Sequence, residues 1–349
     1  MKKFIPFTIS LFFYSVLLIN SVDGQNGNIP QILVTKNPSP EAVSLYQYIG
    51  QISGKQTMSG QHSVPLLGST RLAAVYKSTG QYPAVFGQDF GFSFPGDWDG
   101  INFRQQLVDE AIRRNNEGFI ITLMWHAVPP TQDEPVKFKE SIQGDLTDAE
   151  WKDLITPGTL LNDRWKSQVD VIAFFLKQLK YARVPVLWRP YHEMNGDWFW
   201  WGKKKGEQGY KKLYKMLYDR LVYFHGLNNL IWVYNTNEFK NGVDSLAEYY
   251  PGDDFVDIIT TDVYTQGFDK ENYRQITALA GNKPVALGEV GIPPSAELLK
   301  DQPRWVWFMT WGDPGGKAFS IYQSDQVIKL KDLPWVKVKE PIMSYPVLK

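Results

Sequence analysis

The sequence predicts an α/β protein that folds as a single (β/α)8 TIM barrel, and two observations support this prediction. Eight short runs rich in β-branched and aromatic residues recur along the chain, with stretches of helical length between them, which is the alternation expected of parallel βα units. The 349 residues also contain no internal repeat and no low-complexity linker, and barrels of about 250 residues or more commonly form one domain.

Each of the eight runs has the length and composition of a buried parallel strand, a short apolar stretch bounded by polar or turn-forming residues. In chain order they are Gln56–His62, Tyr82–Phe90, Phe119–His126, Val184–Glu193, Leu230–Asn237, Val256–Tyr264, Pro284–Gly291 and Trp305–Trp311. Between them, apolar residues at the three-to-four spacing of a helix packed on a sheet predict helices. These cover Phe103–Asn116, Trp165–Ala182, Tyr210–His225 and Tyr273–Ala280.

Polar and aromatic residues gather at the C-terminal ends of the predicted strands, where barrels of this kind place their chemistry. They are His62, Asp89, His126, Glu193, Asn235, Asp262 with Tyr264, Glu289 and Trp311. Hydrogen-bonded capping would explain a single such residue, but this many titratable and aromatic groups on one rim indicate a cleft. The segment Ala127–Asn162 follows the third strand and is rich in Pro, Asp, Glu and Thr. It is expected to form a wall of that cleft, with a plain surface excursion as the alternative.

The N-terminus has the pattern of an export signal. Two lysines precede an apolar run that is shorter than the ~20 apolar residues a membrane-spanning helix needs. We therefore expect residues 1–24 to be a signal peptide that is cleaved between Gly24 and Gln25. Residues 25–349 are then the barrel domain of a secreted or periplasmic protein, and an uncleaved anchor is the alternative.

Charge balance and aromatic content indicate a neutral ligand. The chain has 37 Lys and Arg against 37 Asp and Glu, so no broad cationic face is offered to nucleic acid or anionic lipid. Its 13 Trp include rings that could serve as platforms for sugars, although most indoles are expected in the core. Without cysteine, the hydrophobic core must stabilise the fold. We expect a monomer that binds neither nucleic acid nor, once the signal is cleaved, a membrane.

Two glutamates at strand ends have the surroundings that glycoside cleavage requires, one protonated carboxyl and one ionised carboxylate. Glu193 precedes an indole-rich loop, where desolvation would raise its pKa and keep it protonated. Glu289 ends an apolar run between Gly288 and Gly291, whose small size would let the backbone approach a substrate. Glu193 is therefore the expected general acid/base and Glu289 the expected nucleophile. For either residue, a salt-bridged structural glutamate is the alternative.

The segment around Glu193 resembles a known catalytic signature. Residues Trp188–Gly202, which read WRPYHEMNGDWFWWG, resemble the acid/base motif of glycoside hydrolase family 26, the family of many bacterial β-1,4-mannanases. The resemblance runs through most of the chain after residue 24. It implies a (β/α)8 barrel, a retaining double-displacement mechanism, no cofactor, and β-mannan or another β-linked plant polysaccharide as substrate. Further motifs in the family's order are Gly60-Gln61-His62, Met124-Trp125-His126, Asp262-Val263-Tyr264, Leu287-Gly288-Glu289 and Thr310-Trp311-Gly312.

The resemblance also implies roles for single residues. It places Glu193 at the end of strand four as acid/base and Glu289 at the end of strand seven as nucleophile. Residues around the sugar at the cleavage point follow by the same resemblance. Trp198 would be a stacking ring, Trp311 a platform and His126 a lining residue. His192 would bind the sugar or orient the nucleophile, and Tyr264 would donate a hydrogen bond to the nucleophile. Trp151 resembles a further binding-site tryptophan, but the loop spacing around it is too variable to assign it a role.

Two residues near Glu193 depend on the geometry of the fourth strand. Arg189 lies two pleat repeats before Glu193, so in a regular strand it shares that face. It could bind substrate, hold Glu289 ionised or form a structural ion pair. Strict alternation would point His192 and Glu193 to opposite faces, so both reach the cleft only if the strand ends or bulges there.

Three other functions are compatible with parts of the sequence. The strand-end residues His62, His126, His192 and Asp262 could be ligands in a barrel metal hydrolase, although no metal is expected because that scheme leaves the indole-rich loop without a role. A non-catalytic carbohydrate-binding protein would lack one catalytic carboxylate, and both are present. Action on xylan or mixed-linked β-glucan instead of mannan is the alternative within the family.

Overall fold

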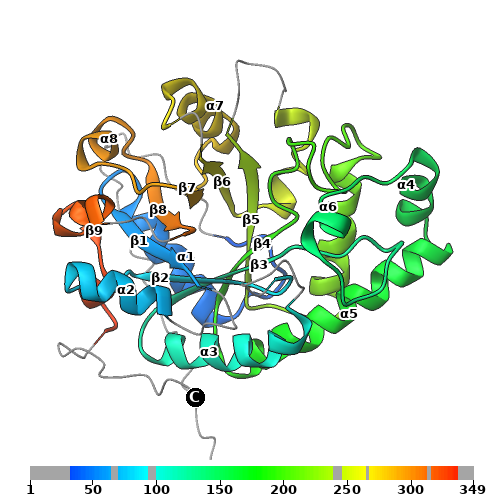
Figure 1. The fold of residues 1–349 in the computed structure, drawn as a ribbon, viewed down its shortest axis with the longest axis horizontal. Coiled ribbons are helices and arrows are strands. Elements are labelled where there is room, and N and C mark those ends of the chain that lie inside the picture. Colours follow the sequence, from blue (N-terminus) through cyan, green and yellow to red (C-terminus); the bar gives the residue numbers. More distant parts are fainter. Residues whose placement is uncertain are drawn as a thin grey trace, which may run out of the picture.

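The computed structural model describes residues 32–63, 70–92, 100–238, 246–264, 267–312 and 316–336, and its strands form a parallel barrel surrounded by helices (Figure 1). Each strand pairs with its neighbours in chain order, and β1 pairs in parallel with both β8 and β2, which closes the barrel. The predicted fold is therefore confirmed. The barrel strands are β1 (Thr57–His62), β2 (Val85–Asp89), β3 (Ile120–Trp125), β4 (Val186–Pro190), β5 (Leu230–Asn237), β6 (Ile258–Val263), β7 (Val285–Val290) and β8 (Trp305–Thr310).

The helices begin and end where local chemistry satisfies their free backbone groups. The hydroxyl of Ser39 accepts from the N–H of Ala42 at the start of α1, with Pro40 in the first turn. Asp269 caps α7 in the same way, and that helix ends at Gly281, whose φ is 55°. The α-helices of the described ranges are α1 (Pro40–Ile52), α2 (Thr70–Thr79), α3 (Arg104–Asn116), α4 (Asp148–Ile155), α5 (Leu160–Tyr181), α6 (Tyr210–Tyr218), α7 (Lys270–Ala280) and α8 (Ala296–Asp301).

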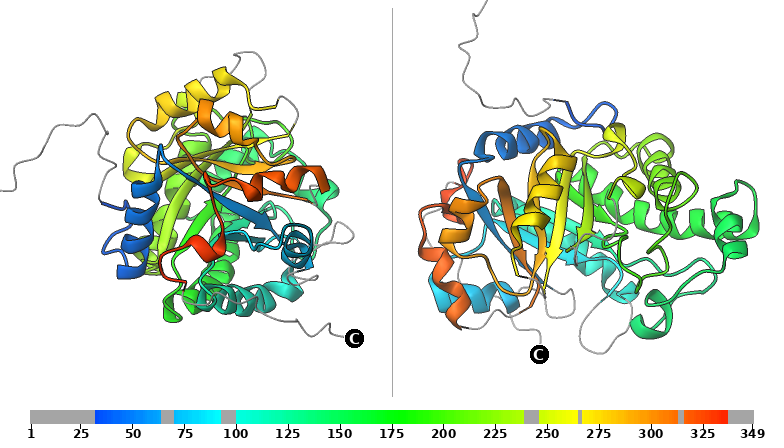
Figure 2. Two further views of the ribbon diagram at one scale, coloured as in Figure 1. Left: turned by 90° about the vertical axis from the view of Figure 1, so that its left-hand side faces the viewer. Right: turned by 90° about the horizontal axis from the view of Figure 1, so that it is seen from above.

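Helix α1 lies across the N-terminal end of the barrel, opposite the end toward which the strands point (Figure 2). The hydroxyl of Tyr46 in α1 donates to the carbonyl of Asp257, just before β6, over 3.2 Å. The hydroxyl of Thr35 donates to the carbonyl of Leu230 at the start of β5 over 2.7 Å. A short strand, β9 (Val327–Ile328), pairs in parallel with β1 outside the barrel. With its N-terminal end covered in this way, the barrel offers its C-terminal rim for a site.

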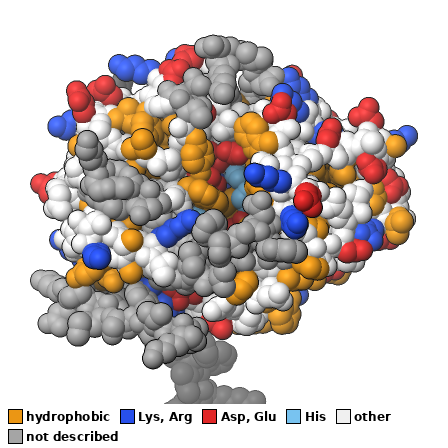
Figure 3. Space-filling model, in the orientation of Figure 1, with side chains coloured by type: hydrophobic (Ala, Val, Ile, Leu, Met, Phe, Trp, Pro, Cys, Tyr) orange, Lys and Arg blue, Asp and Glu red, His pale blue; other side chains and the backbone are white. Residues whose placement is uncertain are grey.

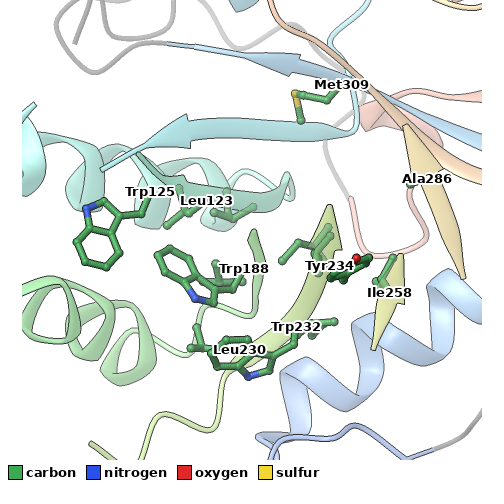
Figure 4. Packing of buried hydrophobic residues seen from close by; sticks show 14 of the residues in the cluster. Leu123, Trp125, Trp188, Leu230, Trp232, Tyr234, Ile258, Ala286 and Met309 are labelled. Carbon is green, nitrogen blue, oxygen red and sulfur yellow. The ribbon is translucent and has the colours of Figure 1, made fainter. Parts of the chain in front are cut away.

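Aromatic side chains fill the space between the strands and the helices. Trp188 of β4 lies in register with Leu123 of β3 and Trp232 of β5, and Figure 4 shows them with Trp125 and Met309. Nine tryptophans of the described ranges are buried, which agrees with the expectation that most indoles belong to the core. A buried aromatic side chain removes ~150–250 Å² from water, which contributes roughly 4–6 kcal/mol before entropy is subtracted. This core stabilises the barrel without disulfides.

The fourth strand ends earlier than the sequence predicted. β4 stops at Pro190, whereas the predicted run continues to Glu193. Tyr191 and Glu193 have φ values of 47° and 56°, a left-handed conformation that is uncommon for residues other than glycine. Because the strand has already ended, His192 and Glu193 are not bound by strand alternation and both reach the cleft. The regular strand assumed between Arg189 and Glu193 thus stops at Pro190, but Arg189 still directs its charge to Glu289, as expected.

A bulge in β7 determines where Glu289 points. Thr261 of β6 pairs with Leu287, but the next residue, Asp262, pairs with Glu289. Gly288 is thus an extra residue in β7, as in a β-bulge. The bulge therefore interrupts the alternation of side chains along β7 one residue before Glu289.

The two glycines beside Glu289 make room for protein side chains. A Cβ on Gly288 would lie 2.0 Å from Oδ1 of Asn235 and 2.7 Å from Oδ1 of Asp262. A Cβ on Gly291 would lie 3.2 Å from the ring of Tyr264. The expectation that these glycines admit the substrate is corrected, because their close neighbours belong to the fifth and sixth βα units.

The remaining predicted elements agree with the structure within a few residues. The predicted helix Tyr210–His225 is divided into α6 and a π-helix over Asp219–Phe224. Helices α1, α2, α4 and α8 and strand β9 were not predicted from the sequence. The signal peptide and its cleavage site lie outside the described residues, so the boundary between residues 24 and 25 stays a prediction. Within the described ranges, no helix combines the length and the apolar composition needed to cross a membrane.

Gly288→Ala should destabilise the barrel and displace the floor of the site. Overpacking a core costs about 1–3 kcal/mol, and here the added methyl group would overlap a buried amide and a buried carboxyl. Urea unfolding would measure the change. Gly312→Ala is the matched control, because a Cβ on Gly312 meets nothing within 4 Å. Equal free energies of unfolding for the two variants would contradict the close packing around Gly288.

Candidate active site

A cavity of about 470 Å³ opens at the C-terminal ends of the strands. Figure 3 shows it as a hollow with acidic and histidine side chains at its floor and hydrophobic ones beside it. Both predicted catalytic glutamates line it, as do five of the six predicted binding residues. Those five are His126, His192, Trp198, Tyr264 and Trp311.

Hydrogen-bond donors hold Glu289 from two sides. Nη2 of Arg189 donates to Oε1 of Glu289 over 2.7 Å, and the hydroxyl of Tyr264 donates to Oε2 over 2.6 Å. Nε2 of His192 lies 3.7 Å from Oε1. The Tyr264 residue as a whole is 43% exposed, but its hydroxyl end is turned inward to this carboxylate. Glu289 is therefore a buried, salt-bridged carboxylate with a fixed orientation.

Arg189 lies beneath the cavity and not on its wall. It is 3% exposed, and its Nη1 donates to Oδ1 of Asn235 over 2.8 Å and lies 3.4 Å from Oδ1 of Asp262. Burial, reinforced by the charge of Glu289, raises the pKa of Asp262 well above its usual range. This favours the protonated form of Asp262, which leaves the guanidinium charge for Glu289. Of the roles considered for Arg189, the structure places it as an ion-pair partner of Glu289, away from the space that a sugar would occupy.

The loop after β4 holds Glu193 in place. The N–H of Glu193 donates to the carbonyl of Asn235 over 2.8 Å. Nε1 of Trp201 donates to the carbonyl of His192, and Nε1 of Trp198 donates to Oε2 of Glu193, each over 2.7 Å. These bonds stabilise a backbone whose left-handed residues cost on the order of 1–3 kcal/mol each. Two of the indoles in this loop thus build the site directly.

Glu193 has the raised pKa that a general acid needs. Burial, with a further contribution from the charge of Glu289, raises the pKa of Glu193 to about 8. The hydrogen bond from Trp198 and the charge of Arg189 act in the opposite direction without cancelling the effect of burial. The desolvation of Glu193 was expected from the sequence, whereas the hydrogen bond from Trp198, which stabilises the ionised form of Glu193, was not. At neutral pH Glu193 is a proton donor beside the carboxylate of Glu289.

Buried imidazoles form part of the cavity wall, and His62 and His192 among them are kept neutral. The rings of His126 and His192 are perpendicular, with centroids 4.5 Å apart. His62 stacks on Trp311 with centroids 3.8 Å apart. Burial lowers the pKa of His62 and of His192 well below the usual range, and the neighbouring Arg71 and His126, respectively, add to the effect. Neutral imidazoles and an indole suit a ligand that is rich in hydroxyl groups and carries no charge.

Five further lining residues were missed in the sequence analysis. Phe138 and Gln143 line the cavity, so residues 127–162 do contribute to its wall, as expected. Phe199 lies in the indole-rich loop, where its aromatic neighbours could have identified it. Arg71 and Phe92 complete the set, and no spacing signal in the sequence marks them.

Trp151 does not belong to the cavity. It is 7% exposed, its Nε1 donates to the carbonyl of Gln208 over 2.8 Å, and its ring packs on Trp200. It is a structural residue that anchors α4 to the loop after β4.

Among the residues that the structure describes, one group of side chains has ligand atoms close enough to bind a metal ion. Ligand atoms of His192, Asp262 and Glu289 lie within 4.8 Å of one another. Arg189 contacts both of these carboxylates from below, at 2.7 Å from Glu289 and 3.4 Å from Asp262. A fixed guanidinium thus already supplies the positive charge that a cation would bring.

Comparison with known proteins gives one family. Residues 34–341 match the model of glycosyl hydrolase family 26. A mannan endo-1,4-beta-mannosidase from Thermothelomyces thermophilus is 37% identical over 85% of this chain. The solved structure of GH26A from Muricauda sp. is 43% identical, with a TM-score of 0.81 over 86% of this chain and 99% of that chain. A beta-mannanase from a symbiotic protist of the termite Reticulitermes speratus, solved with a gluco-manno-oligosaccharide, is 30% identical, with a TM-score of 0.75 over 89% and 99% of the two chains.

The chain spans only part of several curated relatives. It covers 62% of the Thermothelomyces protein and 47% and 50% of two mannan endo-1,4-beta-mannosidases from Piromyces sp.. What those whole proteins do is therefore carried to this chain only as a proposal.

The raised pKa of Glu193 predicts a pH-dependent stability difference. The pKa in the folded protein is about 8 against a usual 4.5, so the unfolded chain releases this proton more readily and the folded state loses stability as pH rises through that window. Glu193→Gln does not titrate. The Tm of the variant minus that of the wild type should therefore grow between about pH 5 and pH 8, measured by calorimetry. Glu297→Gln, at an exposed position, is the control, and its Tm difference from the wild type should stay constant over this pH range. A Tm difference that also stayed constant for Glu193→Gln would show that Glu193 ionises normally.

Proposed function

The chain belongs to glycoside hydrolase family 26, and from this premise we propose that it hydrolyses β-1,4-mannosidic linkages in mannan, glucomannan or galactomannan by a retaining double displacement. The observation that carries the proposal is the pairing of unlike carboxyls in one cavity. Glu193 is buried with a pKa raised to about 8, whereas Glu289 is salt-bridged to Arg189. A retaining glycosidase needs this combination.

In the first step Glu289 attacks the anomeric carbon while Glu193 protonates the departing glycosidic oxygen. Tyr264 and Arg189 each bind one oxygen of Glu289, so the carboxylate is oriented before the substrate arrives. Proton donation by a positioned acid typically contributes about 10²–10⁴-fold to the rate. The products of this step are a glycosyl ester on Glu289 and an ionised Glu193.

In the second step Glu193 acts as the base that activates water. The charge of Glu289 is one cause of the raised pKa of Glu193, and that charge disappears when the ester forms. The pKa of Glu193 therefore falls at the stage at which it must accept a proton. Water attacks the anomeric carbon while Glu193 takes its proton, and the bond from that carbon to Glu289 breaks. The free sugar forms, and both carboxyls return to their starting states.

The rest of the cavity supports a glycan substrate. Trp198 and Trp311 present partly exposed rings on which a sugar could stack, and the neutral imidazoles offer hydrogen bonds without charge. Relatives that are 37% and 30% identical carry the names of mannan-degrading enzymes. Xylan or mixed-linked β-glucan is the alternative substrate, and the substrate panel below separates it from mannan.

We propose that the protein acts outside the cytoplasm. The support is the sequence pattern of residues 1–24, and a polymeric substrate has to be cut before a cell can take it up. A monomer is expected, and no cofactor or metal is needed by the reaction as described.

The test of the proposed function is product analysis on a substrate panel. Purified protein should release oligosaccharides from mannan, glucomannan and galactomannan, in the presence of EDTA, and ¹H NMR should show that the new reducing end first appears in the β configuration. Glu289→Gln is the inactive control. Turnover of xylan or lichenan alone would replace the substrate assignment. A first product in the α configuration would exclude the retaining mechanism. A loss of activity in EDTA that zinc restores would favour a metal hydrolase.

Alanine at each glutamate should cause a different kinetic defect. Glu193→Ala should still form the glycosyl-enzyme from an activated aryl glycoside, which needs little protonation, and then stall because no base activates water. Azide needs no deprotonation, so it should rescue this variant. Glu289→Ala should turn over every glycoside poorly, because the covalent route is lost. Burst kinetics with and without azide would measure both effects. Azide rescue of Glu289→Ala with inverted product, together with no burst for Glu193→Ala, would reverse the two roles.

A further inference from the structure

Asp89 is a buried carboxylate in the cavity wall that neither step of the proposed reaction uses. It ends β2, is 3% exposed and lines the cavity. Its Oδ1 accepts from the N–H of Gly91 over 2.7 Å and from the N–H of His126 over 3.1 Å. Its Oδ2 lies 2.6 Å from Nδ1 of His126. The carboxylate thus contacts three nitrogens, two from the main chain and one from an imidazole.

These contacts place a proton on Nδ1 of His126. The two main-chain groups on Oδ1 can only donate, so Asp89 acts there as an acceptor. On the other oxygen, the proton between a carboxyl and an imidazole belongs to the imidazole, which is ordinarily the more basic of the two groups by about 2.6 pKa units. A neutral imidazole carries a single N–H. Of the two neutral tautomers of His126, these contacts therefore select the one whose lone pair is on Nε2.

Nε2 of His126 has no hydrogen-bond partner among the described residues, although its residue is only 5% exposed. Its surroundings are mainly aromatic. The rings of Phe92, Phe138 and Phe199 lie at centroid distances of 5.9, 5.3 and 5.2 Å from that of His126. Buried polar nitrogens normally find a partner, and His126 lines the cavity. A donor from a bound ligand would complete its hydrogen bonding.

We propose that Asp89 is a positioning residue that sets the tautomer of His126, so that Nε2 accepts a hydrogen bond from a hydroxyl of the sugar at the cleavage point. The identity of the ligand rests on the proposed function, but the tautomer does not. Tyr264 and Arg189 already use their donors on Glu289. His126 adds an acceptor of fixed direction, which a sugar hydroxyl satisfies and a ligand lacking that hydroxyl leaves unpaired.

Asp89→Asn reverses the polarity of this one contact with little change in shape. The amide oxygen can still accept from the N–H groups of Gly91 and His126, while the amide nitrogen then donates toward Nδ1 of His126. The proton of the imidazole should move to Nε2, which becomes a donor. The expected result is a fall of roughly 10- to 100-fold in kcat/KM on manno-oligosaccharides, as expected when a buried hydrogen bond is left unmatched, with a cooperative unfolding transition retained.

The tautomer is read directly by ¹⁵N NMR of the imidazoles. The chain has 4 His, so each signal can be assigned by substitution. At a pH where an ordinary imidazole is neutral, wild-type His126 should show the Nδ1–H form, and Asp89→Asn should show the Nε2–H form. A purely structural role for Asp89 would not move this signal.

Two controls separate positioning from general damage. Asp257→Asn changes a buried aspartate at the other end of the barrel, which likewise accepts hydrogen bonds from two main-chain N–H groups, those of Val34 and Trp232. Because that site is distant and independent, the variant should keep kcat/KM within about twofold of the wild-type value. In a His126→Ala background, Asp89→Asn should have no further effect, because a residue that acts only through His126 cannot add to its loss.

Several results would overturn the proposal. Wild-type His126 in the Nε2–H form would do so without any variant or substrate. The proposal would also fail if Asp89→Asn changed the tautomer of His126 but left kcat/KM unchanged. It would fail as well if Asp89→Asn caused its full loss of kcat/KM in the His126→Ala background. If the wild type showed the Nδ1–H form but hydrolysed no mannan, the proposed substrate would be wrong while the tautomer assignment would stand.

Discussion

The buried ion pair between Arg189 and Glu289 is the interaction on which the site depends. Its two residues are 3% and 4% exposed, and burying such a pair is favourable only when the remaining hydrogen-bonding groups are also satisfied. The barrel meets this condition with residues from four successive βα units. Arg189 of β4 also contacts Asn235 of β5 and Asp262 of β6. Tyr264, directly after β6, contacts Glu289 of β7. Removing either charge would leave the other uncompensated in the interior, typically at a cost of about 3–5 kcal/mol.

This single guanidinium makes two residues of the same type chemically different. Glu289 receives the positive charge directly, through a contact of 2.7 Å. Glu193 receives less of it and is affected mainly by burial and by the neighbouring carboxylate, which together raise its pKa to about 8. Burial and the charge of Glu289 raise the pKa of Asp262 as well. A cluster of three acidic groups around one cation is thus compatible with folding because only one of them needs to be ionised at neutral pH.

Function at this rim is obtained at some cost in stability. Tyr191 and Glu193 have left-handed backbones, and the loop after β4 compensates with hydrogen bonds from its indoles. Nε1 of Trp165 adds another, to the hydroxyl of Tyr191 over 2.9 Å. These contacts explain why the loop contains so many tryptophans. The rings of Trp200 and Trp201 are buried behind the site, whereas the ring of Trp198 lines the cavity. The N–H of Trp201 holds the backbone at His192, and the N–H of Trp198 holds the side chain of Glu193.

Much of this protein could be derived from its sequence because burial leaves a local pattern of apolar residues. Each barrel strand is a short apolar run, so the eight strands and their polar ends were visible, and the two glutamates were identified by position and neighbours. The features that were missed or assigned wrongly leave no such local pattern. The end of β4 at Pro190, the bulge at Gly288 and the location of Arg189 beneath the cavity depend on backbone torsions and on contacts between strands distant in sequence.

The sequence by itself determined the closed barrel, the rim that carries the chemistry and the identity of the two carboxyls, since hydrophobic patterning and residue type are local properties. Only the tertiary structure decided the state of those carboxyls. Protonation follows from burial and from the distance to other charges, and these are set when β4, β5, β6 and β7 converge on one point. The same holds for the partnership of Asp89 with His126, which are 37 positions apart and meet because the second and third strands end side by side.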